Sequence, residues 1–288
     1  QHPDPAEDLL PLALSRPDEA RARAEAVLVG APEPRTAAIA WHCLGIVHRD
    51  AGRFDEAHAA FGRAARAARA GGDTARLTEV MASRGVALAL SGRPAAGVRL
   101  LTRAAASADR ASRPRVLVLQ AHVLLEHGRV AEALTDLPTA LAAARRAGDR
   151  LWEARALVHL SWARTMTGES ARAARAAEAA DEIFTELGQV HEAAWTVTNR
   201  AEAALADGDL PRALALVETA AERFAAAGEV PTKLAETRCR ALLAAGLAPE
   251  ALTAARGAAR SAPPLSRAEL LLVGATAALA DEDPVTAA

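Results

Sequence analysis

Cys43 belongs to the most reactive side-chain type in the sequence, because a thiolate can act as a nucleophile or bind a metal, and His42 and His48 lie close to it. Both roles require the side chains to converge on one point. Each residue turns an α-helix by about 100°, so side chains one or six positions apart point in different directions. The pattern favours a small buried cysteine with two packing or surface histidines. His122 and His127, five positions apart, lead to the same interpretation.

No motif of a common catalytic or metal site is present in the sequence. It contains no Gly-x-Ser-x-Gly, no Walker-type phosphate-binding loop, no His-Glu-x-x-His and no Cys-x-x-Cys. The two cysteines, Cys43 and Cys239, are too far apart in the sequence to suggest a disulfide framework. We expect no catalytic residue, no metal site and no cofactor, and therefore predict that this chain is not an enzyme.

The composition limits the classes of partner. The sequence has 34 basic and 36 acidic residues and a formal net charge of −2, which gives no reason to expect direct binding to nucleic acid. No apolar run approaches the roughly 20 residues that cross a bilayer. All basic residues except Lys233 are arginines, as in proteins of GC-rich genomes. We expect a cytoplasmic protein that binds neither nucleic acid nor membrane directly.

A repeat of about forty residues organises the whole sequence, and glycines mark it. These are Gly52, Gly92, Gly128, Gly168, Gly208 and Gly246, at spacings of 40, 36, 40, 40 and 38 residues. Small residues recur in step with them. Seven positions before each glycine stand Gly45, Gly85, Ala121, Ser161, Ala201 and Cys239. Five positions after stand Ala57, Gly97, Ala133, Ala173, Ala213 and Ala251, and twelve after stand Ala64, Ala104, Ala140, Ala180, Ala220 and Ala258.

The spacing predicts stacked pairs of antiparallel helices, because small residues at fixed helix positions allow two backbones to approach closely. Larger apolar residues such as Trp41 and Phe61 fill the space between them. Alanine, the best helix former, is abundant, and no segment alternates apolar and polar residues as a strand does. Helix ends are predicted at further glycines. These are Gly72, Gly148, Gly188 and Gly228.

The repeat also predicts the domain organisation. Residues 1–34 form an atypical helix pair with helices at 4–14 and 17–29, residues 35–261 form six regular pairs, and residues 262–288 form a final capping helix. The sequence lacks an initial Met and ends on what resembles the opening of another helix, at 283–288. We therefore expect that a further domain follows.

One repeat resembles the tetratricopeptide repeat (TPR), in which Trp, Leu-Gly and small residues recur in a fixed order. The matching residues are Trp41, Leu44, Gly45, Gly52, Phe54, Ala57, Phe61 and Ala64. His48 replaces the usual aromatic residue, and the other repeats keep the small residues but not the Leu-Gly pair. The resemblance implies an all-α, right-handed superhelical α-solenoid, in a variant with longer helices than the usual repeat.

A second resemblance concerns the protein context. The segments 45–52, 151–157, 207–211 and 241–248 look like the amino-terminal TPR region of actinobacterial proteins that end in a CHAT domain, a caspase-like peptidase module. Similar alanine-rich repeats occur in actinobacterial transcription regulators. The first resemblance implies a scaffold that regulates or targets an attached peptidase. The alternative is a sensory module that binds a peptide or a small-molecule signal.

The resemblance also implies a concave groove lined by one stripe of each first helix. In the first regular repeat the stripe holds Ile39, His42, Ile46 and Arg49. Carried through the later repeats, the candidate partner-binding residues are Arg115, His122, Arg155, His159, Trp162, Trp195, Asn199, Glu202, Lys233 and Arg240. This mixture suits an extended peptide or a protein with acidic and apolar side chains. A solvated helix face with local ion pairs would give a similar composition. We predict a protein or peptide partner, and a homodimer is a further possibility.

Overall fold

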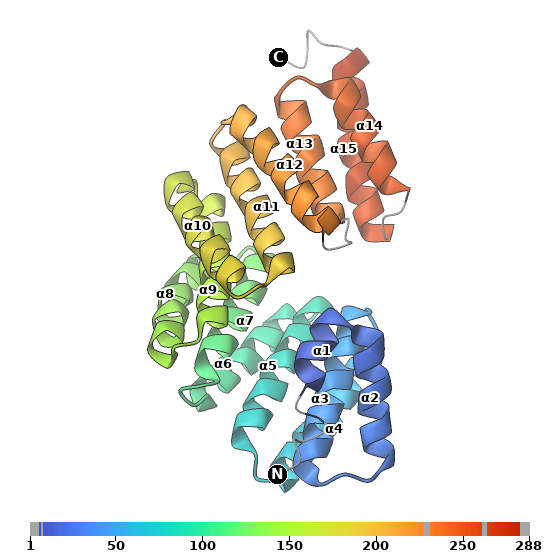
Figure 1. Cartoon of the computed structure of the whole chain (residues 1–288), viewed down its shortest axis with the longest axis vertical. Coiled ribbons are helices and arrows are strands. Elements are labelled where there is room, and N and C mark those ends of the chain that lie inside the picture. Colours follow the sequence, from blue (N-terminus) through green and yellow to red (C-terminus); the bar gives the residue numbers. More distant parts are fainter. Residues whose placement is uncertain (1–5, 7, 227–230, 261–263, 283–288) are drawn as a thin grey trace. The chain divides into compact units, whose positions relative to one another are not determined.

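The computed structural model describes residue 6 and residues 8–226, 231–260 and 264–282 (Figure 1). Within these ranges the chain forms fifteen helices and no strand. In chain order the helices are α1 (Leu9–Ser15), α2 (Pro17–Val29), α3 (Pro34–Asp50), α4 (Phe54–Ala70), α5 (Thr74–Leu90), α6 (Pro94–Ser107), α7 (Arg113–Glu126), α8 (Val130–Ala147), α9 (Arg150–Met166), α10 (Ser170–Glu186), α11 (Val190–Ala206), α12 (Leu210–Ala226), α13 (Thr232–Ala244), α14 (Ala248–Ala259) and α15 (Pro264–Glu282).

The helices divide into two compact units, which we call unit 1 (residues 1–152) and unit 2 (residues 153–288) and describe separately. In unit 1, α3 packs on α4, α5 on α6 and α7 on α8, and α5 contacts both α3 and α7. In unit 2, α11 packs on α12 and α13 on α14, α11 contacts α13, and α15 packs on α13 and α14. We call α3, α5, α7, α9, α11 and α13 the first helices, and their successors in the chain the second helices. Short connections reverse the chain within each pair, so the paired helices run antiparallel (Figure 1).

The repeating glycines form the turns within the pairs. All six have a positive φ, between 70° and 80°. At the first of these turns Gly52 N–H donates to the Arg49 carbonyl and Arg53 N–H to the His48 carbonyl, each at 2.9 Å. These bonds satisfy carbonyl groups that the end of α3 leaves without a helical partner. Only glycine adopts this backbone conformation without strain, so the sequence rhythm follows from the turn geometry.

The small residues of the repeat lie where paired helices touch. A Cβ atom on Gly97 would lie 2.5 Å from the Gly85 carbonyl oxygen, and one on Gly45 would overlap the ring of Phe61. The three small-residue series are buried throughout, except that Ala258 is half-buried. The expected seam of small against large residues is therefore present, although Trp41 and Met81 are only half-buried.

Some predicted features fall outside the described residues: the start of the first helix at 4, the glycine stop at 228 and the tail at 283–288. In the described part of the chain α1 begins at Leu9 and packs on α2 and α3. The division into a terminal pair, six regular pairs and a capping domain stays a prediction. None of the described helices combines the length and the apolar character that a membrane crossing requires.

Candidate partner-binding surface

The predicted groove residues lie on the first helices of both units. Eight of the ten candidates are half-buried, and Lys233 and Arg240 are exposed. The expectation is wrong for the first regular repeat, where Ile39, His42 and Ile46 are buried rather than open. Their helix, α3, contacts α1, α2, α4 and α5, and the ring of His42 lies between Ser83 of α5 and Phe61 of α4. We call the remaining ten candidates the first-helix stripe.

Arg115 links the stripe of unit 1 across two repeats. Its Nη1 atom lies 3.6 Å from Glu79 Oε2, which Arg76 also contacts at 2.5 Å. The Arg115 guanidinium is 5.8 Å from the centre of the Trp152 ring, a cation–π distance. Glu79 therefore joins α5 to α7, and Arg115 is held between a carboxylate and an aromatic ring.

Burial keeps two histidines of unit 1, His42 and His122, neutral at physiological pH. Burial lowers the pKa of His122 to about 4, with further lowering by the positive charges of Arg49 and His127. Burial also lowers the pKa of His42 well below its ordinary value, and Arg115 adds to the effect. His42 Nε2 forms a 2.8 Å hydrogen bond with Ser83 Oγ, and its ring packs edge-on against Phe61. His122 thus contributes a neutral imidazole to the stripe, while His42 is a core residue.

Arg155 and His159 form the start of the stripe in unit 2. Arg155 Nη2 lies 3.0 Å from Glu192 Oε1, so this ion pair joins α9 to α11. His159 Nδ1–H donates to the Arg155 carbonyl oxygen at 2.8 Å, which orients the imidazole along the helix. The ring of Trp162 lies 6.4 Å from that of His159, centre to centre. A cation, an imidazole and an indole are therefore adjacent on one face of α9.

Trp195 occupies the corresponding face of α11. Its Nε1–H donates to His191 Nε2 at 2.9 Å, and its ring meets the Phe224 ring edge-on at 5.3 Å between centres. Phe224 belongs to the buried core of unit 2, against which Trp195 packs. Trp195 is therefore fixed on its inner side by the core and leaves part of its indole exposed.

A third ion pair joins α11 to α13. Lys233 Nζ lies 3.3 Å from Glu202 Oε1 and 3.3 Å from Glu236 Oε2. Glu202 also accepts a hydrogen bond from Thr237 Oγ1 at 3.2 Å. The negative charges hold the pKa of Lys233 above its ordinary value, although burial acts in the opposite direction. This end of the stripe is occupied by internal pairs, and Arg240 lies beyond them.

No family model matches the sequence, and no curated protein matches it. Solved structures do match the fold. The APC/C hetero-tetramer Cut9–Hcn1 aligns with a TM-score of 0.71 at 12% identity, over 96% of this chain and 49% of that chain. The Rap protein complexed with competence and sporulation factor gives a TM-score of 0.68 at 14% identity, over 99% and 87%. A tetratricopeptide repeat protein from Parabacteroides merdae gives 0.62 at 16% identity, over 94% and 98%. The fold is that of a TPR protein.

The match confirms the predicted all-α solenoid of TPR-like helix pairs, and at these identities it shows the fold alone. The identity of any site must come from the residues of this chain. Within the described residues no group of three His, Cys, Asp or Glu side chains is placed to hold a metal ion. Cys43 is buried, its thiol directed at the Ala20 carbonyl oxygen 3.7 Å away, and burial raises its pKa to about 11. A thiol with this pKa is a poor nucleophile.

The sequence left open whether the stripe binds a partner or is a solvated helix face with local ion pairs. In the structure the main contacts of the stripe connect neighbouring first helices. The pairs are Glu79 with Arg115, Arg155 with Glu192, and Glu202 with Lys233. Glu192 was missed as a member. The available signal was the opposite charge on successive first helices, at separations close to the repeat length.

Proposed function

We propose that this protein, which has a TPR-like fold, is a non-enzymatic scaffold that binds a partner protein or peptide along the first-helix stripe of unit 2. The observation that carries the proposal is the placement of two half-buried tryptophans, Trp162 and Trp195, on first helices that the Arg155–Glu192 pair joins. The chain has four tryptophans in all, so half of them lie on this stripe. Tryptophan and arginine are the side chains most often found at the energetic centre of protein interfaces.

The ion pairs of the stripe are compatible with binding. Arg155 and Glu192 are partly exposed, and an ion pair of this kind contributes about 0–1 kcal/mol to stability. A partner carboxylate can therefore replace Glu192 beside Arg155 at little cost. The pair meanwhile keeps the guanidinium in a defined position, which lowers the entropy cost of association.

The structural neighbours support the same class of function. The Rap protein was solved in complex with competence and sporulation factor, and Cut9 in a hetero-tetramer with Hcn1. Both therefore use this fold in assemblies with another molecule. For this chain we infer the same general use, with a partner that carries apolar and acidic side chains.

The test is binding of a partner isolated with the full chain as bait, measured for Trp162→Ala and Trp195→Ala. Each substitution should weaken binding by about 1–4 kcal/mol if the indole is an anchor. Phe54→Ala provides a control, because Phe54 is also a half-buried aromatic side chain but lies at the start of α4, a second helix. Equal losses for all three variants, or lower stability with unchanged affinity, would assign Trp162 and Trp195 to the core instead.

The resemblance to CHAT-domain proteins supports a narrower version of the proposal. In that version the scaffold regulates or targets a peptidase module encoded after residue 288. The corresponding gene should then continue into an α/β domain with a catalytic His and Cys. A helix-turn-helix domain encoded before residue 1 would instead support the sensory module of a transcription regulator. Light scattering on the full chain tests the further possibility of a homodimer.

A further inference from the structure

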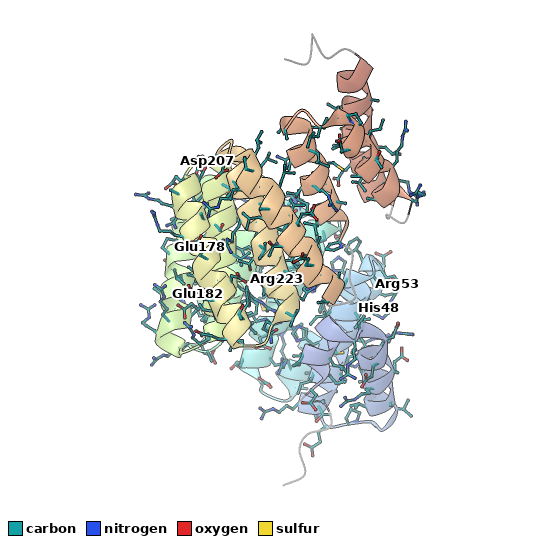
Figure 2. The ribbon with its side chains drawn as sticks, turned by 45° about the horizontal axis from the view of Figure 1, so that its top comes forward. His48, Arg53, Glu178, Glu182, Asp207 and Arg223 are labelled. Carbon is teal, nitrogen blue, oxygen red and sulfur yellow. The ribbon has the colours of Figure 1, made fainter. Side chains whose placement is uncertain are left out.

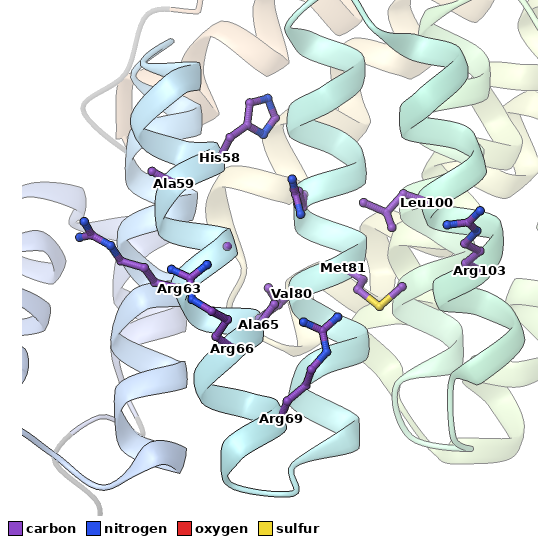
Figure 3. Close-up of a pocket in the computed structure, with 12 residues that line it drawn as sticks. His58, Ala59, Arg63, Ala65, Arg66, Arg69, Val80, Met81, Leu100 and Arg103 are labelled. Atoms are coloured by element: carbon purple, nitrogen blue, oxygen red, sulfur yellow. The ribbon is translucent and has the colours of Figure 1, made fainter.

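A cavity of about 650 Å³ lies on unit 1 between α4, α5 and α6 (Figure 3). Its floor is apolar and includes Val80, Met81 and Leu100. The charged part of its lining is entirely basic. It consists of Arg63, Arg66 and Arg69 on α4, Arg84 on α5 and Arg103 on α6.

The arginines are placed by specific contacts. Arg63 lies over the ring of Trp41, with 4.5 Å between the guanidinium carbon and the ring centre. Arg66 reaches across Gly62, so that its Nη1 atom lies 3.8 Å from the point that a Cβ on Gly62 would occupy. Figure 3 shows Arg63, Arg66 and Arg69 on α4 and Arg103 on the other side of the pocket. In the described part of the chain none of the five guanidiniums pairs with a carboxylate.

Helix geometry explains only part of this cluster. A cation in the last turn of a helix is stabilised by the helix dipole, and Arg69 is in the last turn of α4. That effect does not account for arginines that converge from three helices on one cavity. Like charges brought together in this way repel one another unless an anion lies between them.

Unit 2 shows what normally accompanies an arginine at this point of the repeat. Arg84, Arg200 and Arg238 share one repeat position, eight residues before the turn glycine of their pair. Arg200 pairs with Glu178 at 3.5 Å and with Asp181 at 3.6 Å, both on α10. Arg238 pairs with Glu218 on α12. In both cases the second helix of the preceding pair supplies the carboxylate.

The corresponding carboxylates are missing in unit 1. Glu178 and Glu218 stand ten residues after their turn glycines, and Asp181 stands thirteen after. The same positions of α4 hold Gly62 and Ala65, which line the cavity. One helical turn beyond Gly62, Arg66 replaces an acidic residue. The residues at its position in α10 and α12 are Glu182 and Glu222.

In the other repeats, the position eight residues before the turn glycine varies together with the position ten residues after the preceding turn glycine. Where the first helix carries Gln120 or Leu160 instead of arginine, the preceding second helix carries the uncharged Thr102 or Pro138. Among Arg84, Arg200 and Arg238, Arg84 is therefore the one that pairs with no carboxylate of the described residues. At the positions of Glu178 and Asp181, unit 1 has only the hydrogen atom of Gly62 and the methyl group of Ala65.

We propose that this cavity is a docking site for an acidic segment of a partner protein, whose carboxylates take the places that Glu178 and Asp181 hold in unit 2. The apolar floor receives an apolar side chain of the same segment. The site is separate from the first-helix stripe, since it uses second helices and a different face of α5. It gives the scaffold a second contact, with a partner of defined chemistry.

A carboxylate fits this cavity better than a nucleic acid does. The chain itself binds carboxylates at the equivalent arginines of unit 2. Among the described lining residues only His58 carries an aromatic ring, so bases find little of the stacking platform that single-stranded nucleic acids use.

The decisive experiment restores the missing carboxylate. Gly62→Glu places an acidic side chain where unit 2 has Glu178, and apart from its chain neighbours and the backbone of α4 its Cβ meets only Arg66 Nη1, at 3.8 Å, among the described residues. The new carboxylate should pair with Arg84 and occupy the site. Gly62→Gln is the matched control, because it has the same size without the charge.

The probe is a fluorescein-labelled peptide built from Glu, Asp and Leu, followed by anisotropy with the full chain at low salt. A peptide with Gln and Asn in place of the acids serves as the reference. We expect saturable binding of the acidic peptide at concentrations up to about 1 mM. Gly62→Glu should weaken it by roughly tenfold or more, and Gly62→Gln by less than about threefold. Arg175→Glu, an exposed charge change on α10, should behave as the natural chain does.

Three results would overturn the proposal. The first is no binding of the acidic peptide to the natural chain. The second is an equal effect of Gly62→Glu and Gly62→Gln. The third is tighter binding of a dT oligonucleotide or of pyrophosphate, lost in the same variants, which would assign the site to phosphates. Because Trp162→Ala leaves this cavity intact, unchanged peptide binding by that variant separates the site from the first-helix stripe.

Discussion

Unit 1 and unit 2 use the arginines between neighbouring helix pairs differently. In unit 2, Arg200 and Arg223 meet at Asp181, and Arg212 adds a contact to Glu178 at 3.3 Å. Figure 2 labels Glu178 and Arg223. In unit 1, five arginines line a cavity with an apolar floor, and no carboxylate is among the described residues that line it. The difference depends on two positions of the repeat, which are acidic in α10 and reduced to Gly62 and Ala65 in α4. The same position in a TPR stack can therefore join two repeats or recognise a partner.

The largest expected effect comes from Asp181, which holds the arginine pairs of unit 2. Its side chain is only 13% exposed and lies between two guanidiniums, so its removal leaves two positive charges partly buried together. Asp181→Ala should lower the free energy of unfolding by about 2–3 kcal/mol, measured by urea titration. Glu182→Ala, the exposed neighbour labelled in Figure 2, should change it by less than about 0.5 kcal/mol. Equal effects would show that Asp181 is not a shared partner.

Low pH should destabilise unit 1 through protonation of His122. Its folded pKa of about 4 lies below the ordinary value of 6.5, so between these values the unfolded chain binds more protons. Stability is complete above pH 6.5 and falls as the pH decreases toward 4. Between pH 7.5 and pH 5 His122 alone should contribute a loss of about 2 kcal/mol, measured by urea unfolding as the difference between the natural chain and its His122→Gln variant.

His122→Gln is the control for this acid sensitivity and should remove the part of the loss that His122 contributes. His42, whose pKa burial lowers well below its ordinary value, should retain a loss of the same sign in that variant. Hydrogen exchange should show the opening in helices of unit 1. A loss that is unchanged in the His122→Gln variant would contradict the account.

Equivalent arginines should differ in their effect on stability. Arg200→Ala removes contacts to Glu178 and Asp181 and should cost about 1 kcal/mol. Arg84→Ala removes no ion pair within the described residues and should change stability by less than about 0.5 kcal/mol. Thermal unfolding of the two variants, compared side by side, checks the difference. A larger loss for Arg84→Ala would mean that it already has a structural role.

The smallest expected effect is an increase in the free energy of unfolding. Replacement of Gly62 inside α4 by Gln should stabilise the chain by about 0.5–1 kcal/mol, because glycine is a poor helix former. Gly62→Glu should add about 0.5 kcal/mol at low salt through its pair with Arg84. High salt should remove that extra amount and leave the gain common to both variants. A salt-independent difference would exclude the pair.

Local rules explain why the fold was predictable from the sequence. The turn glycines require a positive φ, and Gly45 and Gly97 require a close approach of two helices, so each constraint is visible in a single residue. The ion pairs of the stripe, in contrast, depend on contacts between separate helices and not on local sequence. Whether Arg155 meets Glu192 depends on the distance between α9 and α11, which no local pattern reveals.

Two features of the surface show where sequence reasoning failed and where it could have gone further. The groove was extended to Ile39, His42 and Ile46 because the stripe was carried onto every first helix, whereas these three residues are buried in a helix that contacts α1, α2, α4 and α5. The arginine cavity was missed because the repeats were compared for small residues only. A comparison of charges would have found Gly62 and Ala65 in the places of Glu178 and Asp181.

The pKa of His58 gives the most direct test of whether the arginines of unit 1 bind an acidic partner. It lines the cavity, and its pKa is lowered by burial and then by the charges of Arg93 and Arg84. A carboxylate bound beside Arg84 favours the charged imidazole. In an NMR titration of His58 in the full chain, the acidic peptide should therefore raise its pKa, and the Gln and Asn reference peptide should leave it unchanged. Saturable binding of the acidic peptide with no change in the pKa of His58 would contradict the account.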